Sequence, residues 1–281
     1  MKLSQSQVKT LASQGFLVLP ERFSEKEVAL LRSQVPALLK ENHPGNVIEK
    51  EPGWKFGEGA GKSWGKDSDV VRTAMGLHLR NEVFNTLVHH PKLIAPGFQV
   101  RPEPMYIQQV KVNVKAAFSG SVWQWHYDFA THHKEDGVPR PLALNLHIFL
   151  DDVSHYNGPL YFVPGSHRHG EHGARLDDQT TSYPLWVVEN DVVETLVNQN
   201  GIQAATGKKG TMLIFYDTLL HGSPNNMSPW DRSIFSLILN PVSNAYQKSH
   251  RPDYKHHRDL TPITMAEPNC LESFYELAES K

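Results

Sequence analysis

Two spacings of hydrophobic residues divide the chain near position 105. Before it, several stretches repeat apolar residues every three or four positions, as an amphipathic helix does. From Met105 onward apolar and polar residues alternate, as in a strand with one buried face. We therefore expect one domain (1–281) with a mainly helical N-terminal part (1–104), a β-rich core (105–245) and a polar C-terminal tail (246–281).

The first elements have ends that the sequence marks. A helix over Ser4–Ser13 should end at Gly15, because glycine readily adopts the left-handed conformation that follows many helices. Phe16–Pro20 has the continuous apolar character of a buried strand. Ser24 and Glu27 have the spacing of a capping box, which predicts that a second helix begins there.

The rest of the N-terminal part alternates between a loop-like and a helix-like composition. The segment Asn46–Ser68 is rich in Gly, Pro, Lys and Glu but contains three aromatic residues, Trp54, Phe56 and Trp64. We predict a mobile loop whose aromatic rings pack on the body of the protein or on substrate. The apolar spacing in Val70–His89 predicts a third helix, which Pro91 should break.

The core region contains six strand-like segments separated by turn residues, namely Met105–Val114, Ser121–Phe129, Leu142–Val153, Pro159–Ser166, Gly210–Thr218 and Arg232–Asn240. Strands joined in this way form antiparallel sheets, not the parallel sheet of βαβ units. The predicted fold class is mostly β with flanking helices, as a sandwich or jelly roll.

Two segments lie outside this strand pattern. The insertion 166–209 contains one predicted helix, with Asn190 as its N-cap and Gly201 just after its end. Insertions of this kind often act as lids. The sequence leaves open whether this insertion or the segment 46–68 is the lid. The tail has the pattern of a short final helix around Leu271–Leu277.

Charge and cysteine content narrow the possible partners. The formal net charge is −2 and the isoelectric point is near 6.8, so the basic footprint of a protein that binds nucleic acid or a membrane surface is missing. A small molecule is the expected partner, for a monomer or a homodimer. Cys270 is the one cysteine, which excludes an internal disulfide and favours a cytoplasmic protein. No apolar run approaches the roughly 20 residues that span a bilayer.

A candidate metal site lies in Ser121–His133, which reads SVWQWHYDFATHH. If this stretch is a strand, His126 and Asp128 lie side by side on one face. On its own, such a pair is more often an ordinary hydrogen-bonded contact. A third ligand could come from His221, and two histidines with one carboxylate are the ligand set of non-haem Fe(II) oxygenases.

Arg232 strengthens this hypothesis. It stands eleven residues after His221, at the start of a predicted strand. A planar guanidinium binds a carboxylate through two parallel hydrogen bonds, so an arginine in the same cavity suits a dicarboxylate cosubstrate. Without the other residues, Arg232 would be interpreted as a surface charge.

The joint order of these residues resembles a known family. It comprises His126-x-Asp128, the segment NGPL-x₃-PGSH at Asn157–His167, then His221 and Arg232. This order is similar to that of the phytanoyl-CoA dioxygenase-like Fe(II)/2-oxoglutarate oxygenases. The run QVKVNVKAAFSGSVWQWHYDF-x₄-KEDGVPRPLALN resembles the branch of ectoine hydroxylases and free L-proline 4-hydroxylases, and the likeness covers about 106–244.

The resemblance implies a double-stranded β-helix, a jelly-roll variant, that uses Fe(II), 2-oxoglutarate as cosubstrate and O₂. By position, it implies that iron is bound by His126, Asp128 and His221, and that Arg232 pairs with the distal carboxylate of 2-oxoglutarate. Polar contacts to the cosubstrate would come from Gln109, Asn113 and Asn145. The plain alternative for these last three is a set of polar positions at the edge of a barrel. Related halogenases have a small residue in place of the carboxylate, so Asp128 favours hydroxylation.

The implied substrate is a small amino acid or a derivative of one, hydroxylated at an unactivated C–H with succinate and CO₂ as coproducts. Lys111 replaces an arginine that contributes to substrate binding in ectoine hydroxylases, and could pair with a substrate carboxylate. His132 occupies the place of a tryptophan in both relatives, which makes the pocket smaller and more polar. Neither ectoine nor proline is therefore carried over as the substrate, and a natural-product scaffold is the alternative.

Two other classes of protein remain open at this point. A zinc-dependent hydrolase or cupin-type enzyme would need neither Arg232 nor a cosubstrate pocket. A non-catalytic jelly-roll binding protein would bind no metal tightly. Other conspicuous residues have structural explanations: Trp123 and Trp125 should pack in the core, and His167 should stabilise a turn.

Overall fold

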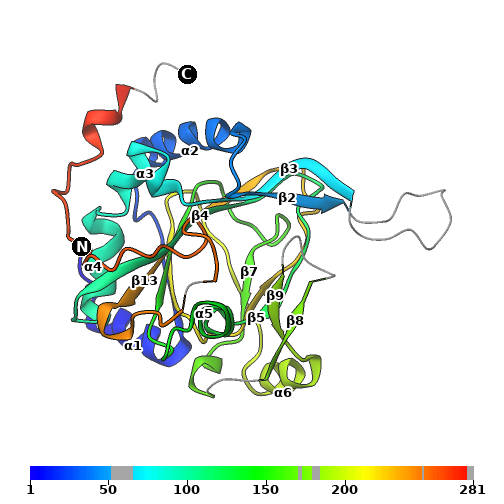
Figure 1. Cartoon of the computed structure of the whole chain (residues 1–281). Helices are drawn as coiled ribbons and strands as arrows, with labels where there is room; N and C mark the ends of the chain where they lie inside the picture. The colour runs from blue at the N-terminus through cyan, green and yellow to red at the C-terminus, as the bar shows by residue number, and fades with distance from the viewer. Residues whose placement is uncertain (52–65, 170–172, 179–183, 249, 277–281) are drawn as a thin grey trace.

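Two antiparallel β-sheets face each other, and helices cover the outer side of the larger one (Figure 1). The computed structural model describes residues 1–51, 66–169, 173–178, 184–248 and 250–276. The predicted fold class, mostly β with flanking helices, is confirmed.

Within the described residues the larger sheet has seven strands and the smaller has six. In spatial order the larger sheet consists of β1 (Phe16–Leu19), β11 (Met212–Tyr216), β6 (Leu144–Phe149), β13 (Arg232–Pro241), β4 (Met105–Lys115), β3 (Lys66–Met75) and β2 (Asn46–Glu51). The smaller consists of β10 (Gln203–Ala205), β7 (Leu160–Phe162), β12 (His221–Ser223), β5 (Trp123–His126), β9 (Leu185–Val188) and β8 (Ala174–Asp177). All six strands predicted from the alternation are present, as β4, β5, β6, β7, β11 and β13.

The alternation along β4 explains how the sheet divides a core from a cavity. Val110, Val112 and Val114 belong to the hydrophobic core beneath the helices. The residues between them, which include Lys111 and Asn113, line a cavity between the two sheets. Successive side chains of a strand point to opposite faces, so a single strand serves both regions.

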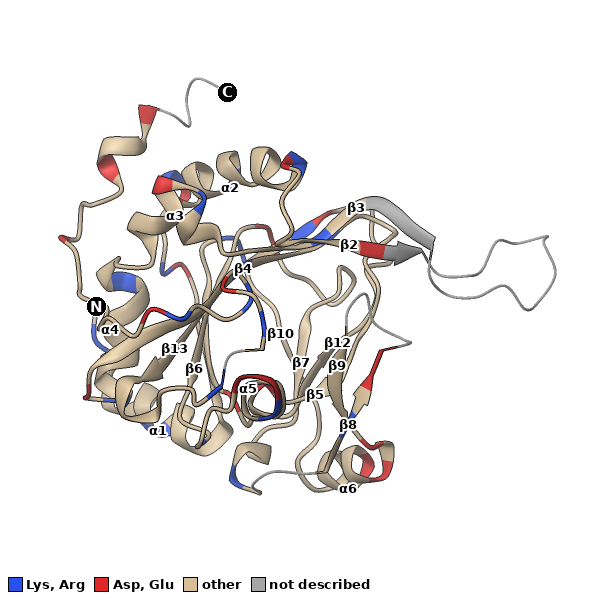
Figure 2. Ribbon diagram, in the orientation of Figure 1, with Lys and Arg blue, Asp and Glu red and all other residues tan. Residues whose placement is uncertain are grey.

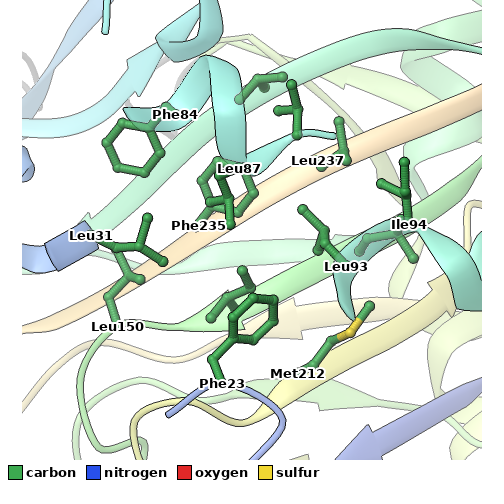
Figure 3. Close-up of a cluster of buried hydrophobic side chains, with 14 of the residues drawn as sticks. Phe23, Leu31, Phe84, Leu87, Leu93, Ile94, Leu150, Met212, Phe235 and Leu237 are labelled. Atoms are coloured by element: carbon green, nitrogen blue, oxygen red, sulfur yellow. The ribbon is translucent and has the colours of Figure 1, made fainter. Parts of the chain in front are cut away.

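Four helices supply the outer half of that core: α1 (Gln5–Gln14), α2 (Glu25–Lys40), α3 (Glu82–Leu87) and α4 (Pro91–Val100). Figure 3 shows side chains of α2, α3 and α4 against those of the large sheet, with Phe84 and Leu87 of α3 beside Phe235 of β13. The Phe84 and Phe235 rings stack with centroids 5.5 Å apart. This packing fixes the large sheet as the rigid wall on which the cavity is built.

The predicted helix ends are confirmed for α1 and α2. Ser24 accepts a hydrogen bond from the Glu27 amide at 3.3 Å, and the Glu27 carboxylate accepts one from the Ser24 amide at 2.7 Å, which completes the capping box. Gly15 has φ 85° after α1, and a Cβ there would lie 2.4 Å from Nδ1 of His167. Glycine is therefore required at position 15 both by its conformation and by space.

The predicted helix over Val70–His89 is wrong. Its first part is the end of β3, where Thr73, Ala74 and Met75 pair with β4, and a one-turn helix η1 (Leu77–Leu79) precedes α3. Gly76 breaks the segment with φ 69°. The apolar residues fit a helical period, but pairing with the edge of β4 outweighs that local preference.

Pro91 also has a different role from the predicted one. It does not terminate a helix but is the first residue of α4, with His90 as the N-cap. Proline lacks an N–H group, and the first turn of a helix does not need one, so this position tolerates it well.

The predicted loop 46–68 is in part a β-hairpin. Its first residues form β2, which pairs with β3. The three aromatic residues of the prediction, at positions 54, 56 and 64, lie outside the described residues.

The insertion 166–209 contributes to the smaller sheet. It supplies β8, β9 and β10, the one-turn helix η2 (Ser166–Arg168) and the helix α6 (Asn190–Asn200). The predicted helix is thus confirmed, with its N-cap at Glu189, one residue before Asn190, and Gly201 at its C-terminal end.

After β13 the chain forms a one-turn helix η3 (Val242–Asn244) and then passes beside α5 (Asp128–Asp136) and β4. The predicted final helix appears as a one-turn helix η4 (Glu272–Phe274), and the end of that prediction lies beyond the described residues. In the part of the chain that the structure describes, no helix is long and apolar enough to cross a membrane.

Candidate metal centre and ligand cavity

Three potential metal ligands converge between the two sheets. His126 ends β5 and His221 begins β12, and the two are direct cross-strand partners. The Nε2 atoms of both histidines lie 3.9 Å from the Asp128 carboxylate, and one ligand atom of each residue lies within 4.8 Å of the other two. Among the described residues this is the one group of three His, Cys, Asp or Glu side chains that could hold a metal ion.

The local structure differs from the prediction at Asp128. The strand ends at His126, and Asp128 is the first residue of α5. Tyr127 lies between them with extended backbone and a side chain buried in a cluster with Phe129 and Val138. The turn from strand into helix, and not a shared strand face, brings the carboxylate to the imidazoles.

The hydrogen bonds of the two histidines prepare them for a metal. Nδ1 of His126 lies 2.6 Å from the carbonyl oxygen of Gln124, and Nδ1 of His221 lies 2.9 Å from that of Leu219. A carbonyl only accepts, so each Nδ1 carries the proton and donates it. Each Nε2 therefore keeps its lone pair directed at the centre of the group, as in metal-binding histidines.

Burial and neighbouring charges favour the metal-binding protonation states. Burial, with a contribution from His221, lowers the pKa of His126 to about 3. Burial alone would raise the pKa of the Asp128 carboxyl, but His221 and Lys111 outweigh it and hold that pKa below its ordinary value. A neutral imidazole and an ionised carboxylate are the forms that bind metal ions.

A cavity of about 370 Å³ surrounds this group. All nine residues proposed from the sequence line it: Gln109, Lys111, Asn113, His126, Asp128, His132, Asn145, His221 and Arg232. They come from both sheets and from α5, so the fold assembles in one place residues that lie more than a hundred positions apart in the chain.

Arg232 is a buried cation with room for an anionic ligand. Its guanidinium donates to the carbonyl oxygen of Gly158 at 2.6 Å and to Oγ of Ser223 at 3.2 Å. Among the described residues, no carboxylate lies within 4.0 Å of it. Burial and the nearby Arg72 lower the pKa of Arg232 to about 9, so the group is still charged at neutral pH. A buried charge of this kind calls for a counter-charge, which a ligand carboxylate would supply.

The three predicted polar contacts differ in how free they are. Nδ2 of Asn145 is buried and has no hydrogen-bond partner within the described parts of the chain, which is costly unless a ligand accepts from it. Asn113 accepts from the Thr73 hydroxyl at 3.0 Å through Oδ1. Nε2 of Gln109 donates to the carbonyl oxygen of Lys255 at 2.6 Å. Gln109 therefore also holds a segment of the tail against β4.

Lys111 and His132 both lie close to the Asp128 charge. Burial lowers the pKa of Lys111, while Asp128 acts in the opposite direction. Burial lowers the pKa of His132 to about 4, again opposed by Asp128, so this imidazole is neutral at pH 7. Nδ1 of His132 is buried without a hydrogen-bond partner among the described residues.

Several cavity residues were not predicted from the sequence. Arg251 and Lys255 come from the segment after β13, and Glu135 comes from α5. Trp123, expected in the core, does pack with Leu185 and Val187 but also lines the cavity. For Glu135 the sequence offered one usable signal. If the run after Asp128 is helical, residues three or four positions apart lie on the same face, and this spacing relates Asp128, His132 and Glu135. The tail residues had no signal in the sequence.

Comparison with known proteins supports these observations. The model of the phytanoyl-CoA dioxygenase (PhyH) family matches residues 11–234. The L-proline trans-4-hydroxylase of Streptomyces griseoviridis is 34% identical over 267 residues, covering 92% of this chain and 94% of the relative. The ectoine dioxygenase of Bordetella bronchiseptica is 32% identical over 263 residues, covering 90% of this chain and 82% of the relative.

Solved structures agree with the sequence relatives. EctD from S. alaskensis, in a crystal structure with 2-oxoglutarate and 5-hydroxyectoine, matches with a TM-score of 0.78 and 30% identity, covering 94% of this chain and 87% of EctD. The α-ketoglutarate-dependent carbocyclase SnoK from nogalamycin biosynthesis has a TM-score of 0.65 and 18% identity, over 94% of this chain and 97% of SnoK, which shows a shared fold alone. This chain belongs to the phytanoyl-CoA dioxygenase (PhyH) family.

Proposed function

We propose that the protein is an Fe(II)- and 2-oxoglutarate-dependent dioxygenase that hydroxylates an unactivated C–H of a small amino acid or amino-acid derivative. The observation that carries the proposal is the presence, in one cavity, of the three converging ligands and of Arg232 without a carboxylate partner among the described residues. The named activities of the sequence relatives, a proline hydroxylase and an ectoine dioxygenase, agree with it.

The donor set fits iron. His126, Asp128 and His221 would hold Fe(II) on one side and leave the other side open to the cavity, which is the arrangement that suits non-haem Fe(II) oxygenases. Bound Fe(II), with 2-oxoglutarate and O₂, supplies the oxidising power for hydroxylation, while succinate and CO₂ are released. The chain's own residues contribute binding, orientation and exclusion of water.

The cosubstrate would be held by residues of the large sheet. Arg232 would bind the distal carboxylate of 2-oxoglutarate. Nδ2 of Asn145, which has no partner among the described residues, would donate a hydrogen bond to the cosubstrate, and Asn113 and Gln109 would be further polar contacts. A zinc hydrolase would not need the buried guanidinium of Arg232 in the cavity wall, and a non-catalytic binding protein would not need the three converging metal ligands.

The size of the cavity favours a small substrate. About 370 Å³ lies near the lower end of the range for small-molecule sites, and the cosubstrate occupies part of it. A small amino acid fits the rest, with Lys111 and His132 as substrate contacts, whereas a long acyl-CoA does not. A natural-product scaffold is the second candidate, and no contact in the described structure favours it.

The insertion 166–209 is a candidate for a lid, because Leu176, Pro184, Leu185 and Trp186 all line the cavity. Most of the segment 46–68, the other candidate, lies outside the described residues. We further infer from composition that the protein acts in the cytoplasm as a monomer or homodimer, with no nucleic-acid or membrane partner.

The function is tested by the requirements of 2-oxoglutarate turnover. Succinate formation should depend on Fe(II) and O₂, and Arg232→Ala should raise the KM for 2-oxoglutarate at least about 100-fold, since a buried charge pair is lost. Arg175→Ala is the matched control, because Arg175 lies on the surface in an exposed pair with Glu189. Equal KM values for the two variants, or turnover without Fe(II), would contradict the proposal.

A further inference from the structure

The segment after β13 forms part of the cavity wall. Gln109 of β4 donates to the carbonyl oxygen of Lys255 at 2.6 Å, and the His257 amide donates to the carbonyl oxygen of Gln108 at 2.9 Å. These bonds hold the segment against β4, and two of its residues, Arg251 and Lys255, line the cavity.

The same segment is also fixed to α5. The Lys248 amide donates to the carbonyl oxygen of Asp136 at 3.3 Å. Arg251 donates to both carboxylate oxygens of Asp136, at 2.7 Å through Nε and through Nη2 as well, and the Asp136 side chain is fully buried. Acidic and basic positions both occur along α5 and along this segment (Figure 2). The Arg251 side chain is therefore fixed by a buried carboxylate, and the backbone at Lys255 is fixed by Gln109.

The charges of the cavity do not balance once the proposed iron and cosubstrate residues are set aside. The remaining charged side chains are Lys111, Glu135, Arg251 and Lys255. Asp136 neutralises Arg251, whereas within the described residues no carboxylate lies within 4.0 Å of Lys111 or Lys255. Among the described residues Lys111 has only the longer-range attraction of Asp128, a carboxylate that bound iron would engage, and Lys255 has no carboxylate in contact. Two ammonium groups in a partly water-excluded space then favour a ligand that carries negative charge.

The one remaining anion has a different neighbourhood. Glu135 accepts a hydrogen bond from the indole N–H of Trp186 at 2.9 Å, and this contact joins α5 to β9. No lysine or arginine among the described residues lies within 4.0 Å of the Glu135 carboxylate. Its second oxygen is available to an ammonium group of a ligand.

We propose that the substrate is an amino acid with two carboxylates, of which the α-carboxylate binds Lys111 and the side-chain carboxylate binds Lys255, while its ammonium group faces Glu135. This inference rests on the proposed function and specifies its substrate class. An amino acid with a single carboxylate, such as proline, would leave one lysine without a counter-charge. The two lysines therefore favour the diacid and select against the monoacid.

The direct test is binding of amino acids to the protein loaded with Fe(II) and 2-oxoglutarate without O₂, measured by isothermal titration calorimetry. L-Aspartate, L-glutamate and L-2-aminoadipate would be compared with L-asparagine, L-glutamine and L-proline. At least one diacid should bind at least about tenfold more tightly than its own monoamide and than proline. With O₂ admitted, the same diacid should stimulate succinate formation and gain one oxygen atom by mass.

The Lys255→Met variant separates charge from structure. It keeps the backbone carbonyl that accepts from Gln109 and most of the side-chain length, and removes the ammonium group. The preference for the diacid over its monoamide should fall at least about tenfold, with the affinity for the monoamide unchanged. Lys9→Met, at an exposed position on α1, should leave the preference intact.

The outcomes distinguish this inference from the proposed function. If Fe(II) and 2-oxoglutarate together give no visible charge-transfer absorption, the proposed function fails. If the absorption forms but diacids bind no better than monoamides, or if Lys255→Met weakens both equally, the diacid inference is overturned and the oxygenase assignment stands.

Discussion

At the scale of single residues, the site depends on buried groups whose protonation is set by their surroundings. His126 is kept neutral by burial, and backbone carbonyls fix which nitrogen carries its proton. Arg232 is kept as a cation without a protein carboxylate beside it, among the residues described. In both cases the protein maintains an incomplete interaction that a ligand would complete.

A buried histidine away from the site gives a prediction for the dependence of stability on pH. Burial, with a contribution from His257, lowers the pKa of His78 from 6.5 to about 3, and neither ring nitrogen has a hydrogen-bond partner among the described residues. Between these values the unfolded chain binds a proton at this position and the folded protein does not. The contribution of His78 to stability is complete above pH 6.5 and decreases as the pH falls toward 3.

We expect His78 to reduce the free energy of unfolding by about 1.4 kcal/mol per pH unit in that window. The measurement is urea denaturation at pH 6.5, 5.5 and 4.5. His78→Phe should reduce the slope of the unfolding free energy against pH by the contribution of one proton. A substitution of the exposed His169 should leave this slope unchanged. An unaltered slope in His78→Phe would show that His78 is not the group responsible.

At the scale of elements, the strands were more predictable than the helices around the site. The alternation in β4 and β13 was readable because each strand separates an apolar core from a polar cavity. The helix α5 could not be predicted in this way. The strand before it ends at His126 and the helix begins at Asp128, so each element is too short to show its own spacing of apolar residues. The three residues proposed as ligands still converge in space, since that proposal follows from the order of residues and not from the local structure.

The contact between α5 and the tail gives a second prediction. Asp136→Asn removes the charge from a fully buried side chain and leaves Arg251 without its partner. The loss should cost about 3 kcal/mol of unfolding free energy, since a cation with 17% of its side chain exposed then lacks a counter-charge.

The matched control is Asp253→Asn in the same segment. Asp253 pairs with Arg258, and both side chains are more than a third exposed. That variant should lose less than about 1 kcal/mol in chemical denaturation. Similar losses in the two variants would mean that the ion pair of Asp136 does not hold the tail against α5.

At the scale of the whole molecule, the two-sheet fold could be predicted from the sequence, and all nine residues proposed as site residues line one cavity. The rest of the cavity wall could not be predicted. Arg251 and Lys255 lie beyond β13, in a polar tail whose composition gives no indication that it returns to β4. Contacts between distant segments place it there, namely backbone hydrogen bonds, the Gln109 side chain and the Arg251–Asp136 ion pair. Long-range contacts of this kind leave no periodic pattern in a sequence, so substrate specificity was harder to predict than reaction type.

We propose that His126, Asp128 and His221 hold Fe(II) together with 2-oxoglutarate. The most direct measurement is the visible absorption spectrum of the protein mixed with both, without O₂. We predict a weak broad charge-transfer band that saturates at one Fe(II) per chain, disappears in Asp128→Ala and persists in Asp191→Ala, whose substituted side chain is exposed on α6. Absence of the band in the unmodified protein, or an unchanged band in Asp128→Ala, would contradict the account.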